Sequence, residues 1–221
     1  MSKMNIHRAL SDLAEIRAQL DRTETYRGFR SAMVGISVLV LGIGYWMESI
    51  WVGVGPAQQV DQYLIVWVSV AVISAIIAGI EMLIRSRVSG NPMVGRLHWS
   101  LASNIAPSFL VGFVVTLLIG FHAREMSVSS SGGGMIWALP GLWSMIYSLG
   151  LLNCRSNLPV QVVGVAVYFL FAGILLLGYN WMTRETAGWQ MLVSFGVGQS
   201  FLALVLFWNL ERSDGREETI S

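Results

Sequence analysis

The segment from Tyr63 to Ile84, YLIVWVSVAVISAIIAGIEMLI, decides the fold, because only one of its residues is charged. The hydrocarbon core of a bilayer is about 30 Å thick, and a helix needs roughly 20 apolar residues to cross it. Five further stretches of similar character occur along the chain, at residues 31–50, 101–121, 135–152, 160–179 and 189–210. The sequence therefore predicts an all-α membrane bundle of about six transmembrane helices within residues 30–210.

Composition supports a lipid bilayer as the solvent of this bundle. Of the 221 residues, 54% are hydrophobic and 12% are charged, whereas soluble domains carry roughly 25% charged residues. The net charge of +1 and the lack of a clustered basic face argue against direct nucleic-acid binding. Cys154 is the single cysteine, which excludes an intramolecular disulfide and a cysteine-based metal site.

The arginines predict the orientation, because cytoplasmic loops of membrane proteins carry an excess of Lys and Arg. With six spans and a cytoplasmic N-terminus, 12 of the 14 basic residues fall on the cytoplasmic side, and the exceptions are Arg124 and Arg184. We expect a multi-pass protein of the cell membrane with both termini, including the tail 211–221, in the cytoplasm. A set of aromatic residues is expected at the outer interface: Tyr45, Trp46, Trp51, Tyr63, Trp67, Trp137, Tyr179, Trp181 and Trp189.

The fourth stretch, residues 135–152, is interrupted by Pro140-Gly141. It is predicted either to span the membrane fully or to form a broken or re-entrant element. Ser144 and Ser148 have the spacing of small residues at helix–helix contacts, and span two repeats that spacing at Ala71, Ala75 and Gly79. We expect both sets to be packing faces.

Residues 1–29 are predicted to contain a cytoplasmic amphipathic helix, because apolar residues recur there at helical spacing on one face. These residues are Ile6, Leu10, Leu13, Ile16 and Leu20. Such a helix could lie on the inner membrane surface or fold back on the bundle. Alternatively, it docks a cytoplasmic partner or a second copy of the chain.

Polar residues inside the apolar stretches are the candidate ligand-binding groups, because each is costly in lipid and needs a partner. Gln199 lies midway along span six, Asn104 precedes Pro107 in span three, and Glu81 is close enough to Arg85 to pair along one helix face. Trp143 and Tyr147 form an aromatic face on span four that could line a pocket. Each could equally serve only to hold the bundle together.

The sequence offers little for catalysis, metals or cofactors. The three histidines are His7, His98 and His122, and the last two are separated by a helix of about 36 Å. No phosphate-binding loop, dinucleotide fingerprint or HExxH helix is present. We therefore expect no cofactor, no metal and no enzymatic activity.

Two segments, Ala138 to Pro159 (ALPGLWSMIYSLGLLNCRSNLP) and His7 to Ala32 (HRALSDLAEIRAQLDRTETYRGFRSA), resemble a group of uncharacterised multi-pass bacterial inner-membrane proteins. The resemblance makes a cytoplasmic protein a candidate partner for the N-terminal helix. It does not imply any particular activity. The leading hypothesis is a non-enzymatic membrane protein that presents this helix to a partner or for self-association. The alternative is a small transporter or ligand-binding bundle that uses the intramembrane polar residues.

Overall fold

The computed structural model describes residues 31–50, 56–89, 92–129, 135–155 and 158–208. The predicted N-terminal helix, with Ile6, Leu10, Leu13, Ile16 and Leu20, and the predicted tail 211–221 lie outside the described residues.

The described chain is helical. Its long helices are α2 (Ser31–Ile50), α3 (Pro56–Ser89), α4 (Pro92–Ser129), α5 (Leu139–Asn153) and α6 (Val162–Thr183). The last helix is built from α7 (Gly188–Met191), a π-helical turn (Leu192–Gly196) and α8 (Val197–Leu206). The all-α prediction and its six helices are confirmed. α3 and α4 extend well past their predicted spans of 63–84 and 101–121.

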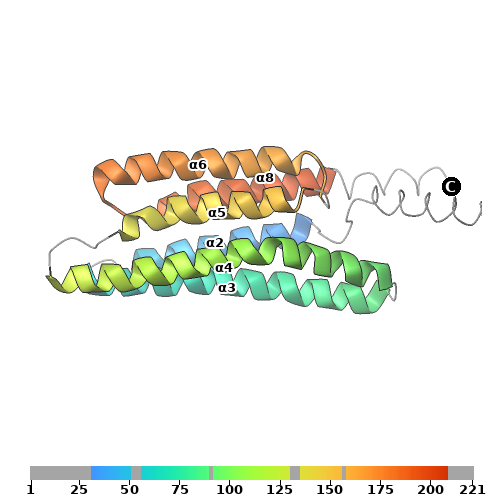
Figure 1. Cartoon of the computed structure of the whole chain (residues 1–221), viewed down its shortest axis with the longest axis horizontal. Coiled ribbons are helices and arrows are strands. Elements are labelled where there is room, and N and C mark those ends of the chain that lie inside the picture. Colours follow the sequence, from blue (N-terminus) through green and yellow to red (C-terminus); the bar gives the residue numbers. More distant parts are fainter. Residues whose placement is uncertain (1–30, 51–55, 90–91, 130–134, 156–157, 209–221) are drawn as a thin grey trace, which may run out of the picture.

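The helices are arranged as a closed bundle (Figure 1). Each of α2, α3, α4 and α5 packs against the next helix in the chain, α6 packs against α8, and α8 returns to α2. Helix α2 begins and α8 ends at the same end of the bundle, which we call the Ser31 end. The opposite end, where α2 finishes, is called the Ile50 end.

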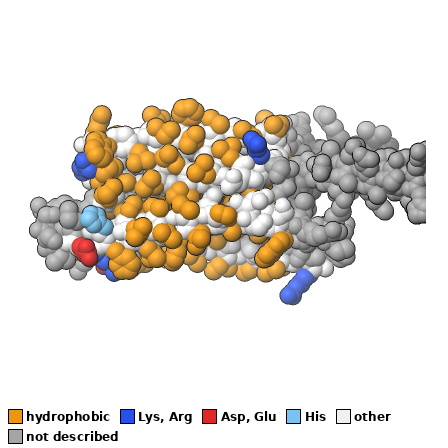
Figure 2. Space-filling model, in the orientation of Figure 1, with side chains coloured by type: hydrophobic (Ala, Val, Ile, Leu, Met, Phe, Trp, Pro, Cys, Tyr) orange, Lys and Arg blue, Asp and Glu red, His pale blue; other side chains and the backbone are white. Residues whose placement is uncertain are grey.

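Among the described residues, four helical stretches are long and apolar enough to cross a membrane: Val60–Ile84, Trp99–Glu125, Val162–Thr183 and Gly188–Leu206. Helix α2 contributes a shorter apolar stretch, Val34–Ile50, and α5 has 15 residues. On the face seen in Figure 2, hydrophobic side chains are spread along the length of the described helices, while the charged ones lie toward the two ends. The described residues thus support a multi-pass membrane protein with four helices that meet the length of a full span, and they do not confirm the predicted count of six spans.

Pro140 lies in the first turn of α5 and does not interrupt the helix. A 3₁₀ turn, Ile136–Ala138, leads into the helix, and Pro140 occupies its first turn, where a missing backbone N–H leaves no hydrogen bond unmade. The predicted interruption therefore lies at the start of the helix, and α5 alone measures about 22 Å. Pro107, in contrast, lies inside α4, which continues through it.

Helices α5 and α6 approach each other at their backbones. A Cβ added to Gly141 would lie 2.8 Å from the carbonyl oxygen of Gly173, and one added to Gly173 would lie 2.7 Å from that of Gly141. The buried hydroxyls of Ser144 and Ser148 donate to the α6 carbonyls of Phe169 (2.8 Å) and Ala166 (2.7 Å). The packing face predicted from Ser144 and Ser148 is therefore present.

The second predicted packing face, on α3, has a different environment. Ala71 and Ala75 are exposed, and a Cβ added to Gly79 would meet nothing within 4 Å. Within the described chain, these small residues therefore do not form a close helix–helix contact.

Candidate functional site

Two of the predicted ligand-binding residues are brought together in the bundle. The Gln199 side-chain amide, on α8, donates a hydrogen bond of 2.8 Å to the Tyr147 hydroxyl, on α5. Gln199 lies eleven residues after the start of α7, about 16 Å along the helix axis, which places the bond near mid-membrane depth. The two residues are 52 positions apart in the sequence, so their pairing depends on the packing of α5 against the last helix.

Aromatic rings surround the Gln199–Tyr147 hydrogen bond. The Tyr147 ring lies 4.7 Å from that of Phe169 and 5.7 Å from that of Phe195, both edge to face. Gly198 allows this packing, because a Cβ there would overlap the Phe169 ring. The amide and hydroxyl thus satisfy each other inside an apolar cluster, as an interhelical hydrogen bond in lipid should.

Trp143 faces a different part of the bundle. Its indole N–H donates to the Thr116 hydroxyl on α4 at 2.8 Å, and its ring stacks on Tyr63 of α3, with 6.4 Å between centroids and 9° between planes. The described contacts of Trp143 and Tyr147 therefore differ, because Trp143 meets α3 and α4 whereas Tyr147 meets α6 and the last helix.

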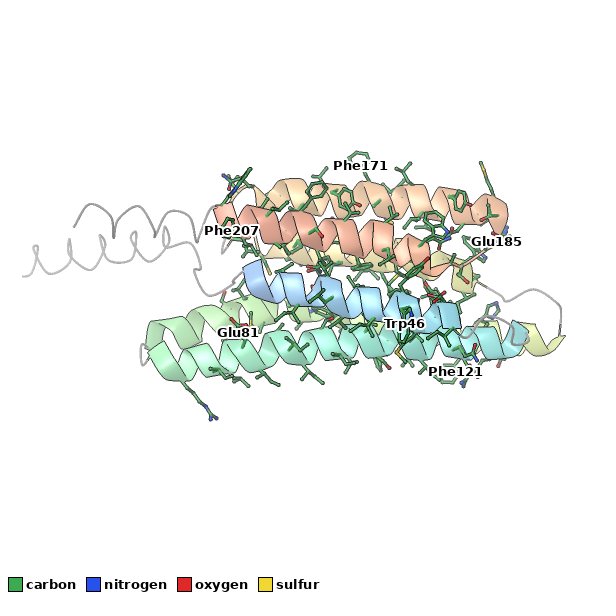
Figure 3. The ribbon with its side chains drawn as sticks, turned by 180° about the vertical axis from the view of Figure 1, so that it is seen from behind. Trp46, Glu81, Phe121, Phe171, Glu185 and Phe207 are labelled. Carbon is green, nitrogen blue, oxygen red and sulfur yellow. The ribbon has the colours of Figure 1, made fainter. Side chains whose placement is uncertain are left out.

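Asn104 and Glu81 lie apart from these groups. Asn104 is half-buried in α4. Glu81 is half-buried in α3 and lies toward the Ser31 end, far from Trp46 and Glu185 at the Ile50 end (Figure 3). The predicted pairing of Glu81 with Arg85 involves a side chain that lies outside the described residues.

Glu48 is a carboxylate that the sequence analysis did not single out. It lies in the last turn of α2 and is half-buried. Its Oε2 accepts the Trp67 indole N–H from α3 at 2.9 Å, and the carboxylate also accepts the backbone N–H of Gly188, where α7 begins. One carboxylate thus joins three helices at the Ile50 end. Glu48 directly follows Tyr45, Trp46 and Met47. A carboxylate within an apolar stretch is the feature of the sequence that could have identified this residue as a candidate.

A second polar cluster joins α6 to the last helix at the same end. Asn180 and Gln190, both buried, exchange hydrogen bonds between their side-chain amides at 3.1 and 2.8 Å. Asn180 also donates to the carbonyl of Trp137 at 2.7 Å. This pair holds its polar atoms in contact with one another and with the backbone, which suits a structural role.

The aromatic residues expected at the outer interface divide into two groups. Tyr45, Trp46, Tyr179, Trp181 and Trp189 are exposed, as an interfacial belt requires. Tyr63, Trp67 and Trp137 are instead buried inside the bundle, while Trp51 lies outside the described residues. Depth in the membrane places an aromatic residue near an interface, but it does not distinguish the lipid-facing side of a helix from the inner one.

Among the described residues, no group of three His, Cys, Asp or Glu side chains is placed to hold a metal ion. Comparisons of the chain with protein-family models, with curated proteins and with solved structures find no match. The sequence and the structure together describe an integral membrane protein of the helical class, whose described part contains four helices long and apolar enough to cross the bilayer.

Proposed function

We propose that this chain is a non-enzymatic membrane protein whose helical bundle holds the N-terminal amphipathic helix at the membrane surface, for a cytoplasmic partner or for self-association. The observation that supports it most is how the polar groups inside the bundle are used. Gln199 bonds to Tyr147, and Trp143 bonds to Thr116. These groups link helices to one another, which is the arrangement expected of a supporting scaffold.

The positions of the first and last described helices support the same proposal. Helix α2 begins at Ser31, directly after the predicted amphipathic segment, and it does so at the end where α8 finishes (Figure 1). Arg87, in the last turn of α3, also belongs to this end. Because positive residues favour the cytoplasmic side, we infer that the Ser31 end faces the cytoplasm of a cell membrane and that both termini lie there.

Crosslinking followed by affinity recovery from native membranes tests this role. The full chain is compared with a chain lacking residues 2–25, and the recovered proteins and the oligomeric state are measured for both. A specific partner or an oligomer that is lost on deletion supports the proposal. Unchanged partners and an unchanged oligomeric state contradict it.

A pair of matched variants shows whether the apolar face of the helix is responsible. Replacing Leu10 and Leu13 by glutamine changes that face, whereas replacing Ser11 and Ala18 by glutamine changes the opposite side of the predicted helix. We expect the first pair to reproduce the deletion and the second pair to behave like the unaltered chain. Equal effects of the two pairs would argue against docking through the apolar face.

A further inference from the structure

Arg184 lies in the short connection between two helices that are long and apolar enough to cross the membrane. The stretch Val162–Thr183 ends directly before it, and Gly188–Leu206 begins four residues later. The next residue, Glu185, lies at the Ile50 end of the bundle (Figure 3). A residue in so short a connection lies at the depth of the lipid headgroups, whichever side of the membrane that end faces.

Two indole rings hold the guanidinium of Arg184. Its Cζ lies 4.7 Å from the centroid of the Trp137 ring and 4.4 Å from that of the Trp181 ring, and the two rings stand nearly perpendicular to each other. Trp137 is buried, and its carbonyl accepts a hydrogen bond from the Asn180 side chain. Trp181, in contrast, is 61% exposed. The cation therefore rests between a ring fixed in the bundle and a ring that faces lipid.

Within the described structure, no carboxylate pairs with this cation. Arg184 is exposed, and the adjacent carboxylate of Glu185 forms no ion pair with it. The other arginine described at this end, Arg124, is paired with Asp61 at 2.5 Å. A ring beneath a guanidinium occupies its face, while its five N–H donors lie in its plane, in a fork that matches the oxygens of a phosphate group. Arg184 thus has the donors for an anion at headgroup depth.

The backbone of Arg184 also indicates a role for its side chain. Helix α6 ends there in the left-handed conformation, with φ 58° and ψ 23°, and the Arg184 N–H donates to the Asn180 carbonyl at 2.8 Å. Glycine is the usual residue at such a helix end, because it adopts positive φ without strain. Arg184 is the one non-glycine residue with positive φ in the described part of the chain. Ending the helix alone therefore does not explain an arginine at this position.

An apolar stripe on α6 leads away from Arg184 along the lipid-facing side. Trp181, Ile174 and Phe171 are exposed and recur at helical spacing, and Phe171 points away from the bundle in Figure 3. Gly178 lies on the same stripe, and a Cβ there would meet nothing within 4 Å. The stripe from Phe171 to Trp181 is about 15 Å long, so an acyl chain can lie along it.

We propose that Arg184 and Trp181 form a binding site for the phosphate group of a membrane phospholipid. The guanidinium donates N–H groups to the phosphate oxygens, and the Trp181 ring holds it at headgroup depth. One acyl chain follows the stripe on α6 toward Phe171. This site is independent of the role proposed for the N-terminal helix.

Native mass spectrometry of the full chain in detergent tests the site, with dioleoylphosphatidylglycerol as the probe. Dioleoylglycerol, which has the same acyl chains and no phosphate, is the matched lipid. We expect the unaltered chain to bind one molecule of the phospholipid at least about tenfold more tightly than the glyceride, because hydrogen bonds to charged groups are strong. Arg184→Gln should remove that preference. Arg184→Gly should remove it as well, although glycine suits the backbone there, and this variant decides the matter if Arg184→Gln does not fold.

Matched substitutions at the same end serve as controls. Arg124→Gln removes the arginine that Asp61 already engages and should leave the preference for the phospholipid unchanged. Trp181→Leu should weaken phospholipid binding about threefold, because a cation–π contact is lost. Trp189→Leu should not weaken it, because that exposed ring contacts Tyr179.

Three results would overturn the proposal. The first is an unaltered chain that binds both lipids equally. The second is equal weakening by Arg184→Gln and Arg124→Gln, since binding would then follow total charge and not the site. The third is displacement of the phospholipid by inorganic phosphate at equal concentration, which would make free phosphate the ligand.

Discussion

The close backbone contact between α5 and α6 gives a sharp prediction about the stability of the bundle. A Cβ on Gly173 would lie 2.7 Å from the Gly141 carbonyl oxygen and 2.6 Å from the Met145 side chain, whereas ordinary contacts begin at 3.4 Å. Gly173→Ala therefore requires the backbones of α5 and α6 to move apart by several tenths of an ångström. The obstacle is partly backbone, which cannot rotate away.

We expect Gly173→Ala to lower the free energy of unfolding by about 1–3 kcal/mol, the usual cost of adding a carbon to a well-packed contact. Gly164→Ala is the matched control, because Gly164 belongs to the same helix and a Cβ there would meet nothing within 4 Å. The control should change stability by less than about 0.5 kcal/mol.

Equilibrium unfolding in mixed micelles, followed by tryptophan fluorescence as the denaturing detergent increases, measures both variants. Combining Gly141→Ala with Gly173→Ala should cost less than the sum of the two single changes, because the first has already separated the helices. The reasoning fails if Gly173→Ala unfolds together with Gly164→Ala, since α5 and α6 would then not be in backbone contact.

The same assay tests three further substitutions. Gln199→Leu, which removes the hydrogen bond to Tyr147, should cost about 0.6–2 kcal/mol, and no loss would show that this bond does not hold the bundle. Gly198→Ala, whose Cβ would overlap the Phe169 ring, should cost about 1–3 kcal/mol, and an unchanged midpoint would mean that the ring moves freely. Tyr63→Phe should raise the stability of the chain by about 1 kcal/mol, because it removes an unsatisfied buried oxygen; a loss of stability would reveal a partner for that oxygen.

The number and order of the helices could be predicted from the sequence, because an apolar stretch of sufficient length has few alternatives in a bilayer. The 31–50 prediction coincides with α2. The apolar spans within α3 and α4, Val60–Ile84 and Trp99–Glu125, lie close to the predicted 63–84 and 101–121. The helices themselves are longer, because they continue into polar residues beyond the apolar stretch, as with Arg87 at the end of α3. Hydropathy indicates which residues lie in the hydrocarbon core, and it does not detect helical turns that continue into water.

The inner and outer faces of each helix could not be predicted in the same way. Lipid and the bundle interior are both apolar, so hydrophobic periodicity no longer separates them. This is why Tyr63 and Trp67 were assigned to the interfacial belt although both are buried. The pairing of Gln199 with Tyr147 was likewise out of reach, since both residues were candidates but nothing in the sequence indicates that their helices meet.

Helix contacts in lipid lack a strong hydrophobic drive, so close packing and interhelical hydrogen bonds specify which helices meet. Glycines and serines specify the α5–α6 contact, and a neutral amide–phenol bond joins α5 to α8. The contact of α2 with α3 and α7 is specified by a carboxylate, Glu48, whose described hydrogen bonds come from neutral groups. One side chain therefore specifies the contact of α2 with both neighbouring helices, because it accepts a hydrogen bond from each of them.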